Sequence, residues 1–309
     1  MKLGAVNVAA VTPHRQNGYD ADLGATLDLV DYLCSAGVHG IALLGTTGEF
    51  PHLNLQDRAH LVRLSAKRSR VPIIAGVTHS TLDGTVVLAE QAADSGVAAV
   101  LVMPPYFFSY GQAEIREFYL RFADRITSGI PIFLYNIPVF TSPISIETSC
   151  ELLATGRFAG IKDSSGSFDA FLQLKAQRRS VPFTILAGSD RIFTLARSAG
   201  ADGVVSGVAC AIPELLLALD RAIQGADAEA TTLLESRLQE FLQWLDRFPA
   251  PVGVREACAA RGLKVGPLAV PLSPEKAREL DQFKSWFQAW APAVQKECSA
   301  LAQKVGSKA

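Results

Sequence analysis

Short apolar runs alternate with amphipathic stretches along roughly the first two thirds of the chain. Each run is four to seven residues long and is rich in Val, Ile, Leu and Ala, without alternation of apolar and polar positions. Continuous runs of this length are typical of strands in a parallel sheet that is covered on both faces. The runs lie at residues 5–11, 40–44, 72–77, 98–103, 131–135, 158–162, 183–187 and 203–206.

The segments between these runs have the period of helices. Leu23, Leu27, Val30 and Leu33 recur at helical spacing, and the SGV at 95–97 and SAG at 198–200 end helices with a glycine just before the next run. Eight strand–helix units in order predict an α/β fold, a closed (β/α)₈ TIM barrel. A doubly wound sheet is the alternative, but no G-x-G-x-x-G follows the first run.

The strand pattern stops near residue 225, and helical patterns separated by prolines follow. We therefore expect a catalytic barrel over residues 1–225 and a helical C-terminal region over residues 226–309 that packs on it. The aromatic residues Trp286, Phe287 and Trp290 fit either a subunit interface or a helix that packs on the barrel.

Charge and cysteine content narrow the class of protein. The chain has 29 Lys and Arg residues against 30 Asp and Glu residues, a net charge of −1, which favours neither nucleic acid nor an anionic membrane as a partner. The five cysteines have no metal-binding spacing and are typical of reduced thiols in a cytoplasmic protein. The apolar run near the N-terminus is too short to cross a bilayer.

Polar residues follow the ends of several predicted strands. Lys162 ends the sixth run, Tyr135 ends the fifth, and GTTGE at 45–49 follows the second. In a barrel these ends meet at one mouth, where catalytic residues lie. A lysine removed from water can act as a free amine and form an imine with a ketone, and a tyrosine hydroxyl can carry protons beside it.

Each of these residues also has a purely structural interpretation. Lys162 could form an ion pair with Asp163 or with another carboxylate at the barrel rim, Tyr135 could be a core tyrosine bonded to a backbone carbonyl, and GTTGE could be an ordinary turn.

Together, GTTGEF (45–50), YNIP (135–138), GIKDSSG (160–166) and LAGSD (186–190) resemble the dihydrodipicolinate synthase / N-acetylneuraminate lyase family, in order and in spacing. The resemblance implies a homotetramer, a dimer of dimers, with class I chemistry on pyruvate or another 2-oxo acid and no metal or cofactor. It implies that Lys162 forms the Schiff base and Tyr135 is the acid/base. Thr46 and Thr47 would hold the carboxylate, Thr47 would also join the proton relay, and Gly188 and Val205 would line the pocket.

Two positions depart from the family's synthases. Phe140 stands where the synthases have an arginine that grips the second substrate's carboxylate, a contact that a phenyl ring cannot make. Phe107 stands where they have a tyrosine that reaches into the neighbouring subunit. Tyr106 or Tyr110 could replace it in the relay, or this aromatic cluster could pack a subunit interface.

The resulting hypothesis is a Schiff-base lyase that reversibly cleaves a 2-keto-3-deoxy sugar acid, or a related hydroxy-oxo acid, to pyruvate and an aldehyde. The alternatives on the same scaffold are a 2-keto-3-deoxy sugar acid dehydratase and a 4-hydroxy-tetrahydrodipicolinate synthase. Outside this class, a phosphate-binding barrel isomerase and a non-catalytic oxo-acid-binding barrel stay open.

Overall fold

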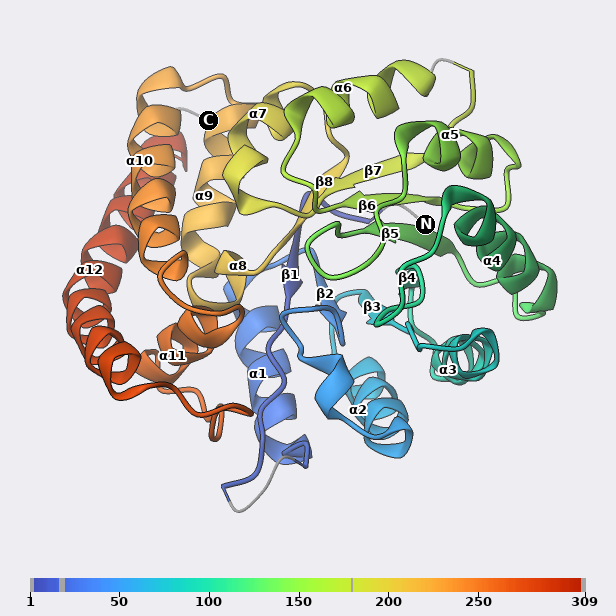
Figure 1. Ribbon diagram of the computed structural model, residues 1–309. Helices are drawn as coiled ribbons and strands as arrows, with labels where there is room; N and C mark the ends of the chain where they lie inside the picture. Colours follow the sequence, from blue (N-terminus) through green and yellow to red (C-terminus); the bar gives the residue numbers. More distant parts are fainter. Residues whose placement is uncertain (1–2, 17–19, 179, 307–309) are drawn as a thin grey trace.

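The computed structural model describes residues 3–16, 20–178 and 180–306 of the chain. Eight parallel strands close into a barrel, each hydrogen-bonded to the next and β8 to β1 (Figure 1). The strands are β1 (Val6–Ala9), β2 (Gly40–Leu43), β3 (Ile73–Gly76), β4 (Ala99–Val102), β5 (Ile132–Asn136), β6 (Gly160–Asp163), β7 (Thr184–Ala187) and β8 (Gly203–Ser206). The closed barrel confirms the predicted (β/α)₈ fold and contradicts the doubly wound alternative.

Burial explains why the strands have continuous apolar runs. Successive strand side chains point alternately into the barrel and toward the helices. Both sides are covered here, so every strand residue except Thr184 is buried. A polar side chain in these strands therefore needs a specific reason, which draws attention to Lys162 and Asp163.

Helices cover the outside of the barrel (Figure 1). Several begin at the residue type expected of an N-cap, as at Asp22 and Asn54, whose side chains accept hydrogen bonds from the first turn. Gly96 and Gly200 follow helix ends at positive φ, as the sequence predicts. The helices are α1 (Leu23–Ala36), α2 (Leu55–Arg68), α3 (Leu82–Asp94), α4 (Gln112–Arg125), α5 (Ile146–Ala154), α6 (Phe168–Gln177), α7 (Phe193–Ser198), α8 (Val208–Ala211) and α9 (Pro213–Gln224), with 3₁₀ turns η1 (Phe50–His52) and η2 (Asp190–Ile192).

Three further helices, α10 (Ala228–Leu245), α11 (Val252–Ala260) and α12 (Pro274–Gly306), lie against one side of the barrel (Figure 1). Helix α10 packs on α9, and α11 packs on α8. Phe241 of α10 packs against Phe287 and Trp290 of α12, so much of the C-terminal aromatic surface is used within the chain. The division at residue 225 stays a prediction, and residues 307–309 lie outside the described residues.

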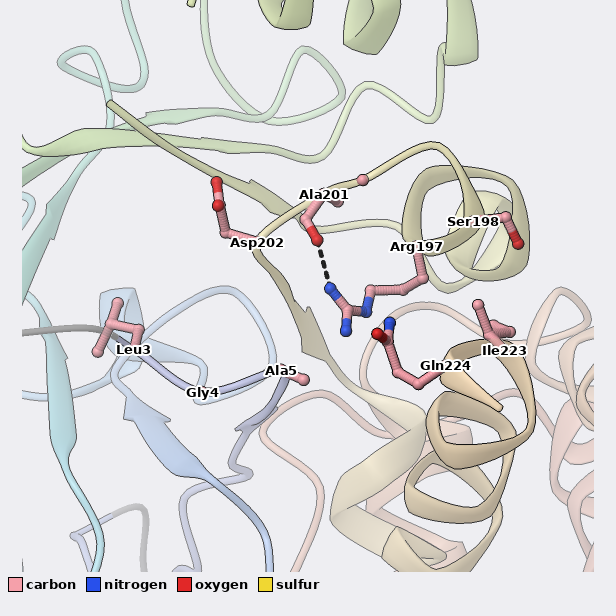
Figure 2. Close-up of a pocket in the computed structure, with 10 residues that line it drawn as sticks. Leu3, Gly4, Ala5, Arg197, Ser198, Ala201, Asp202, Ile223 and Gln224 are labelled. Atoms are coloured by element: carbon pink, nitrogen blue, oxygen red, sulfur yellow. Dashed lines mark hydrogen bonds between the residues drawn. The ribbon is translucent and has the colours of Figure 1, made fainter. Parts of the chain in front are cut away.

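The strand ends opposite the predicted mouth also border a hollow (Figure 2). Its volume is about 730 Å³, and it is lined by residues 3–5, by the turn from α7 to β8 and by the end of α9. Buried Arg197 donates there to the carbonyl of Ala201 and to Asp220. Barrel enzymes carry their chemistry at the other end of the strands, so we assign this hollow no catalytic role.

Within the described ranges, no helix is both long enough and apolar enough to cross a membrane.

Candidate active site

Lys162 and Tyr135 lie side by side near the C-terminal ends of adjacent strands. Their Cα atoms are partners in the β5–β6 register. The side-chain nitrogen Nζ of Lys162 lies 3.9 Å from the centroid of the Tyr135 ring, and both residues are 3% exposed. A primary amine and a phenol therefore meet in a water-poor space at the mouth of the barrel.

Lys162 has no ion-pair partner within 4 Å among the described residues. Asp163 follows it on the strand and points to the other face, because strand side chains alternate. There its carboxylate accepts from Asn136 Nδ2 at 2.7 Å and from the Ser165 hydroxyl at 2.6 Å. The Lys162–Asp163 ion pair considered from the sequence is therefore wrong.

Tyr135 receives one hydrogen-bond contact from the turn after β2. Its hydroxyl lies 3.3 Å from Thr46 Oγ1. Burial raises the pKa of Tyr135, but the positive charge of Lys162 and hydrogen bonds with Thr46, Lys162 and Ser164 oppose it and leave the pKa below its ordinary value. A tyrosine with a lowered pKa is better suited to accept a proton near neutral pH.

The GTTGE segment forms a tight turn between two residues in the left-handed region, Leu44 (φ 57°) and Glu49 (φ 50°). Gly76 allows the turn to approach β3, since a Cβ on Gly76 would lie 2.1 Å from the carbonyl oxygen of Leu44. The amides of Gly48 and Glu49 close the turn. The turn does not open an α-helix directly: η1 follows, and α2 begins only after the N-cap at Asn54.

Thr47 points to a different neighbour from Thr46. Its hydroxyl faces Gly207 after β8, 3.5 Å from where a Cβ on Gly207 would lie. No hydrogen bond joins Thr47 to Tyr135 in the described part of the chain. Consecutive turn residues project in different directions. Thr46 therefore makes the hydroxyl contact to Tyr135, which corrects the relay role expected for Thr47.

The other two expected pocket residues differ in their relation to Lys162. Gly188 lies against it: a Cβ there would be 2.9 Å from Lys162 Cε and 2.1 Å from Ser164 Oγ, so a side chain would displace both. Val205 is buried on β8 beside Asn7 of β1, and no described contact joins it to Lys162.

A pocket of about 240 Å³ opens beside this centre. Thr46 belongs both to its wall and to the contact with Tyr135, so the pocket begins at the candidate reacting groups. Phe140, placed at the substrate by the sequence argument, lines it, as does Tyr106. The rest of the wall includes Phe50, Pro51, Met103 and Pro251, with Glu49, His52 and Thr141 as its other polar residues.

The remaining aromatic residues of the loop after β4 lie outside this pocket. Phe107 is 88% exposed and at positive φ, and its ring packs edge-on against exposed Phe108. The backbone amide of Tyr110 donates to Ser142. Of the three relay candidates, Tyr106 alone borders the pocket, with its ring edge-on to Phe50.

Two acidic residues near the site were not singled out as functional from the sequence. Glu49 binds buried Arg255, with Arg255 Nη1 2.7 Å from Glu49 Oε2. Asp190 accepts a hydrogen bond from the amide of Val208. Burial raises the pKa of Asp190, and the hydrogen bonds from Ser206 and Val208 offset only part of that rise. Glu49 belongs to the GTTGE motif, but its partner Arg255 follows some 200 positions later, so no local sequence pattern links the two residues.

Across the residues that the structure describes, no three His, Cys, Asp or Glu side chains gather as metal ligands would. The expectation of chemistry without metal or cofactor stays a prediction.

Comparison with known proteins agrees with this geometry. The profile of the dihydrodipicolinate synthetase family matches residues 2–290. The chain belongs to this family. An uncharacterized DapA-like lyase of Halobacterium salinarum is 35% identical over 269 residues, 85% of this chain and 87% of that protein.

Two solved structures of this family show the same architecture. The 4-hydroxy-tetrahydrodipicolinate synthase of Methylacidiphilum fumariolicum is 30% identical with a TM-score of 0.84, covering 96% of this chain and 99% of that one. YagE of E. coli K12, solved in complex with pyruvate, is 25% identical with a TM-score of 0.85, covering 93% and 98%. As a member of the dihydrodipicolinate synthetase family, the chain is a lyase of the class I, pyruvate-dependent aldolase type.

Proposed function

We propose that this protein reversibly cleaves a 2-keto-3-deoxy sugar acid, or a related 4-hydroxy-2-oxo acid, to pyruvate and an aldehyde through an imine on Lys162. One observation carries the proposal: a buried lysine, with no ion-pair partner among the described residues, lies 3.9 Å from the ring of a buried tyrosine at the barrel mouth. An amine largely removed from water, with no carboxylate in direct contact, is suited to attack a ketone.

In the proposed reaction, Lys162 Nζ adds to the keto carbon C2 and water leaves, forming a protonated imine. Tyr135 takes the proton from the C4 hydroxyl, the C3–C4 bond breaks, and its electron pair moves toward the imine nitrogen. The aldehyde departs, C3 of the enamine takes up a proton, and water hydrolyses the imine to release pyruvate. Thr46 holds the Tyr135 hydroxyl during these transfers.

The protein is also proposed to work as a homotetramer, a dimer of dimers, in the cytoplasm. Exposed Phe107 and Phe108 pack edge-on against each other in the loop after β4 and form an apolar surface that a second subunit would cover. The free cysteines support the cytoplasmic location. Sedimentation velocity on the purified chain would give four chain masses, and a monomer would contradict the assembly.

The first test is a borohydride trap. Incubation with pyruvate, reduction and peptide mapping should place a reduced pyruvate adduct on Lys162 in the native protein. The adduct should be absent in Lys162→Ala and present in Lys175→Ala, a matched change of an exposed lysine. A folded protein that gives no adduct at Lys162 would exclude the aldolase and favour the isomerase or the oxo-acid-binding barrel.

A further inference from the structure

The pocket beside the reacting centre is where the part of the substrate beyond C4 would lie, so its wall selects the aldehyde. It opens at Thr46, the threonine that contacts Tyr135. Its volume of about 240 Å³ exceeds the roughly 150 Å³ that accommodates a benzene ring in an apolar protein cavity. A substituent of five or six heavy atoms therefore fits.

The pocket wall offers no free cation to a charged substituent, because its one basic side chain, His52, lies 3.7 Å from the Glu49 carboxylate. Neither Lys nor Arg lines it. Arg255, the arginine behind Glu49, is fully buried and already donates to Glu49 and to the carbonyls of Thr12 and Val265. Because a carboxylate without a cation costs several kcal/mol to desolvate, and Glu49 would repel it, an anionic aldehyde is disfavoured.

The polar groups of the wall are also largely used within the protein. Thr46 contacts Tyr135, and the Thr141 hydroxyl lies 3.4 Å from the carbonyl oxygen of Ile137. Among the described residues, no serine lines this pocket. Ser142 and Ser206 accept backbone amides instead, and Ser165 donates to Asp163. Hydroxyl groups on the substituent would lose hydration with few partners in return.

The remaining surface is apolar and aromatic. Phe50 and Tyr106 meet edge to face at 5.4 Å, and Met103, Phe140 and Pro251 complete the wall. Resting on the proposed aldolase reaction, we infer that the aldehyde released or taken up here carries an uncharged apolar group, and that Phe140 is a residue that sets this preference. This selects the related hydroxy-oxo acids within the proposed substrates.

The test uses aldehydes matched in shape, each condensed with pyruvate by the purified protein. 4-Methylpentanal differs from succinic semialdehyde by an isopropyl group in place of a carboxylate, and 2-methylbutanal has the heavy-atom skeleton of glyceraldehyde without its two hydroxyls. We expect kcat/KM to be at least tenfold higher for the apolar member of each pair.

Phe140→Arg supplies the missing cation and should shift the kcat/KM ratio toward succinic semialdehyde at least tenfold. Val139→Arg is the matched control, because Val139 is exposed beside it and does not line the pocket; its ratio should stay as in the native protein. A pyruvate adduct on Lys162 with equal or better use of the charged or hydroxylated aldehydes, or without use of the apolar ones, overturns the inference alone. The absence of the adduct overturns the proposed function and the inference with it.

Discussion

At the residue scale, one lysine and the aspartate after it have opposite environments. Strand alternation turns Asp163 toward Asn136 and Ser165, which satisfy its carboxylate, and turns Lys162 toward the Tyr135 ring. Asp163 therefore anchors the strand end, and within the described residues no carboxylate lies within 4 Å of the Lys162 amine. A buried amine is costly to keep in a protein core, so its retention at the barrel mouth favours a chemical role.

The substitution Tyr135→Phe tests the partner of this lysine. It removes the hydroxyl and keeps the ring, so we expect kcat for cleavage to fall by about 10²- to 10⁴-fold while the reduced pyruvate adduct still forms on Lys162. Steady-state kinetics and the trap measure the two effects separately.

Tyr119→Phe is the matched control for that change. Tyr119 is also buried, and its hydroxyl donates to the Val102 carbonyl at 2.8 Å and meets only the backbone of Tyr135, not the Tyr135 hydroxyl. Its loss should cost about 1 kcal/mol of unfolding free energy and leave kcat nearly unchanged. If Tyr135→Phe kept native kcat, a proton-transfer role for Tyr135 would be untenable.

At the scale of elements, the strands could be predicted because the packing on both their faces requires apolar side chains, and this requirement is written locally in the sequence. Lys162 and Tyr135 could then be predicted to lie close together, because the C-terminal ends of the strands meet at the mouth of a barrel. The direction of each hydroxyl in the turn after β2 could not be predicted, because it depends on the left-handed conformations of Leu44 and Glu49.

The turn after β2 gives its two adjacent threonines different roles, and these roles can be tested separately. Thr46→Val breaks the contact to Tyr135 and should lower kcat about tenfold or more, with little change in KM for pyruvate. Thr47 faces Gly207 and is left for the carboxylate, so Thr47→Val should mainly raise that KM, by roughly tenfold for one charge-assisted hydrogen bond. Equal effects of both substitutions on kcat would contradict the division.

At the scale of the whole molecule, the barrel mouth is tied to the C-terminal helices by a buried ion pair. Arg255 of α11 donates to Glu49 in the turn after β2, to Thr12 after β1 and to Val265 beyond α11. The same connection brings Pro251 to the pocket, opposite residues that precede it by 100 positions or more. A sequence pattern predicts only part of such a pocket wall, because the residues that line it share no local period.

This ion pair predicts how stability depends on pH. Burial raises the pKa of Glu49, but the contact with His14 and the charges of Arg255, His14 and His52 outweigh it and lower the pKa. A carboxyl whose folded pKa is below its unfolded value of about 4.3 stabilises the fold above that value, and this contribution is lost as the pH falls through the folded pKa.

Glu49→Gln keeps the shape, removes the charge and leaves buried Arg255 without its anion, so at pH 7 it should cost about 3–5 kcal/mol of unfolding free energy. The difference from the native protein should shrink as the pH falls below about 4, which denaturant titrations across the pH range would measure. Glu117→Gln, which breaks an exposed pair with Arg121, should cost at most about 1 kcal/mol. A Glu49→Gln protein as stable as the native one at pH 7 would mean that Arg255 is held by its backbone carbonyls alone, and that the charge of Glu49 is not what joins the mouth to α11.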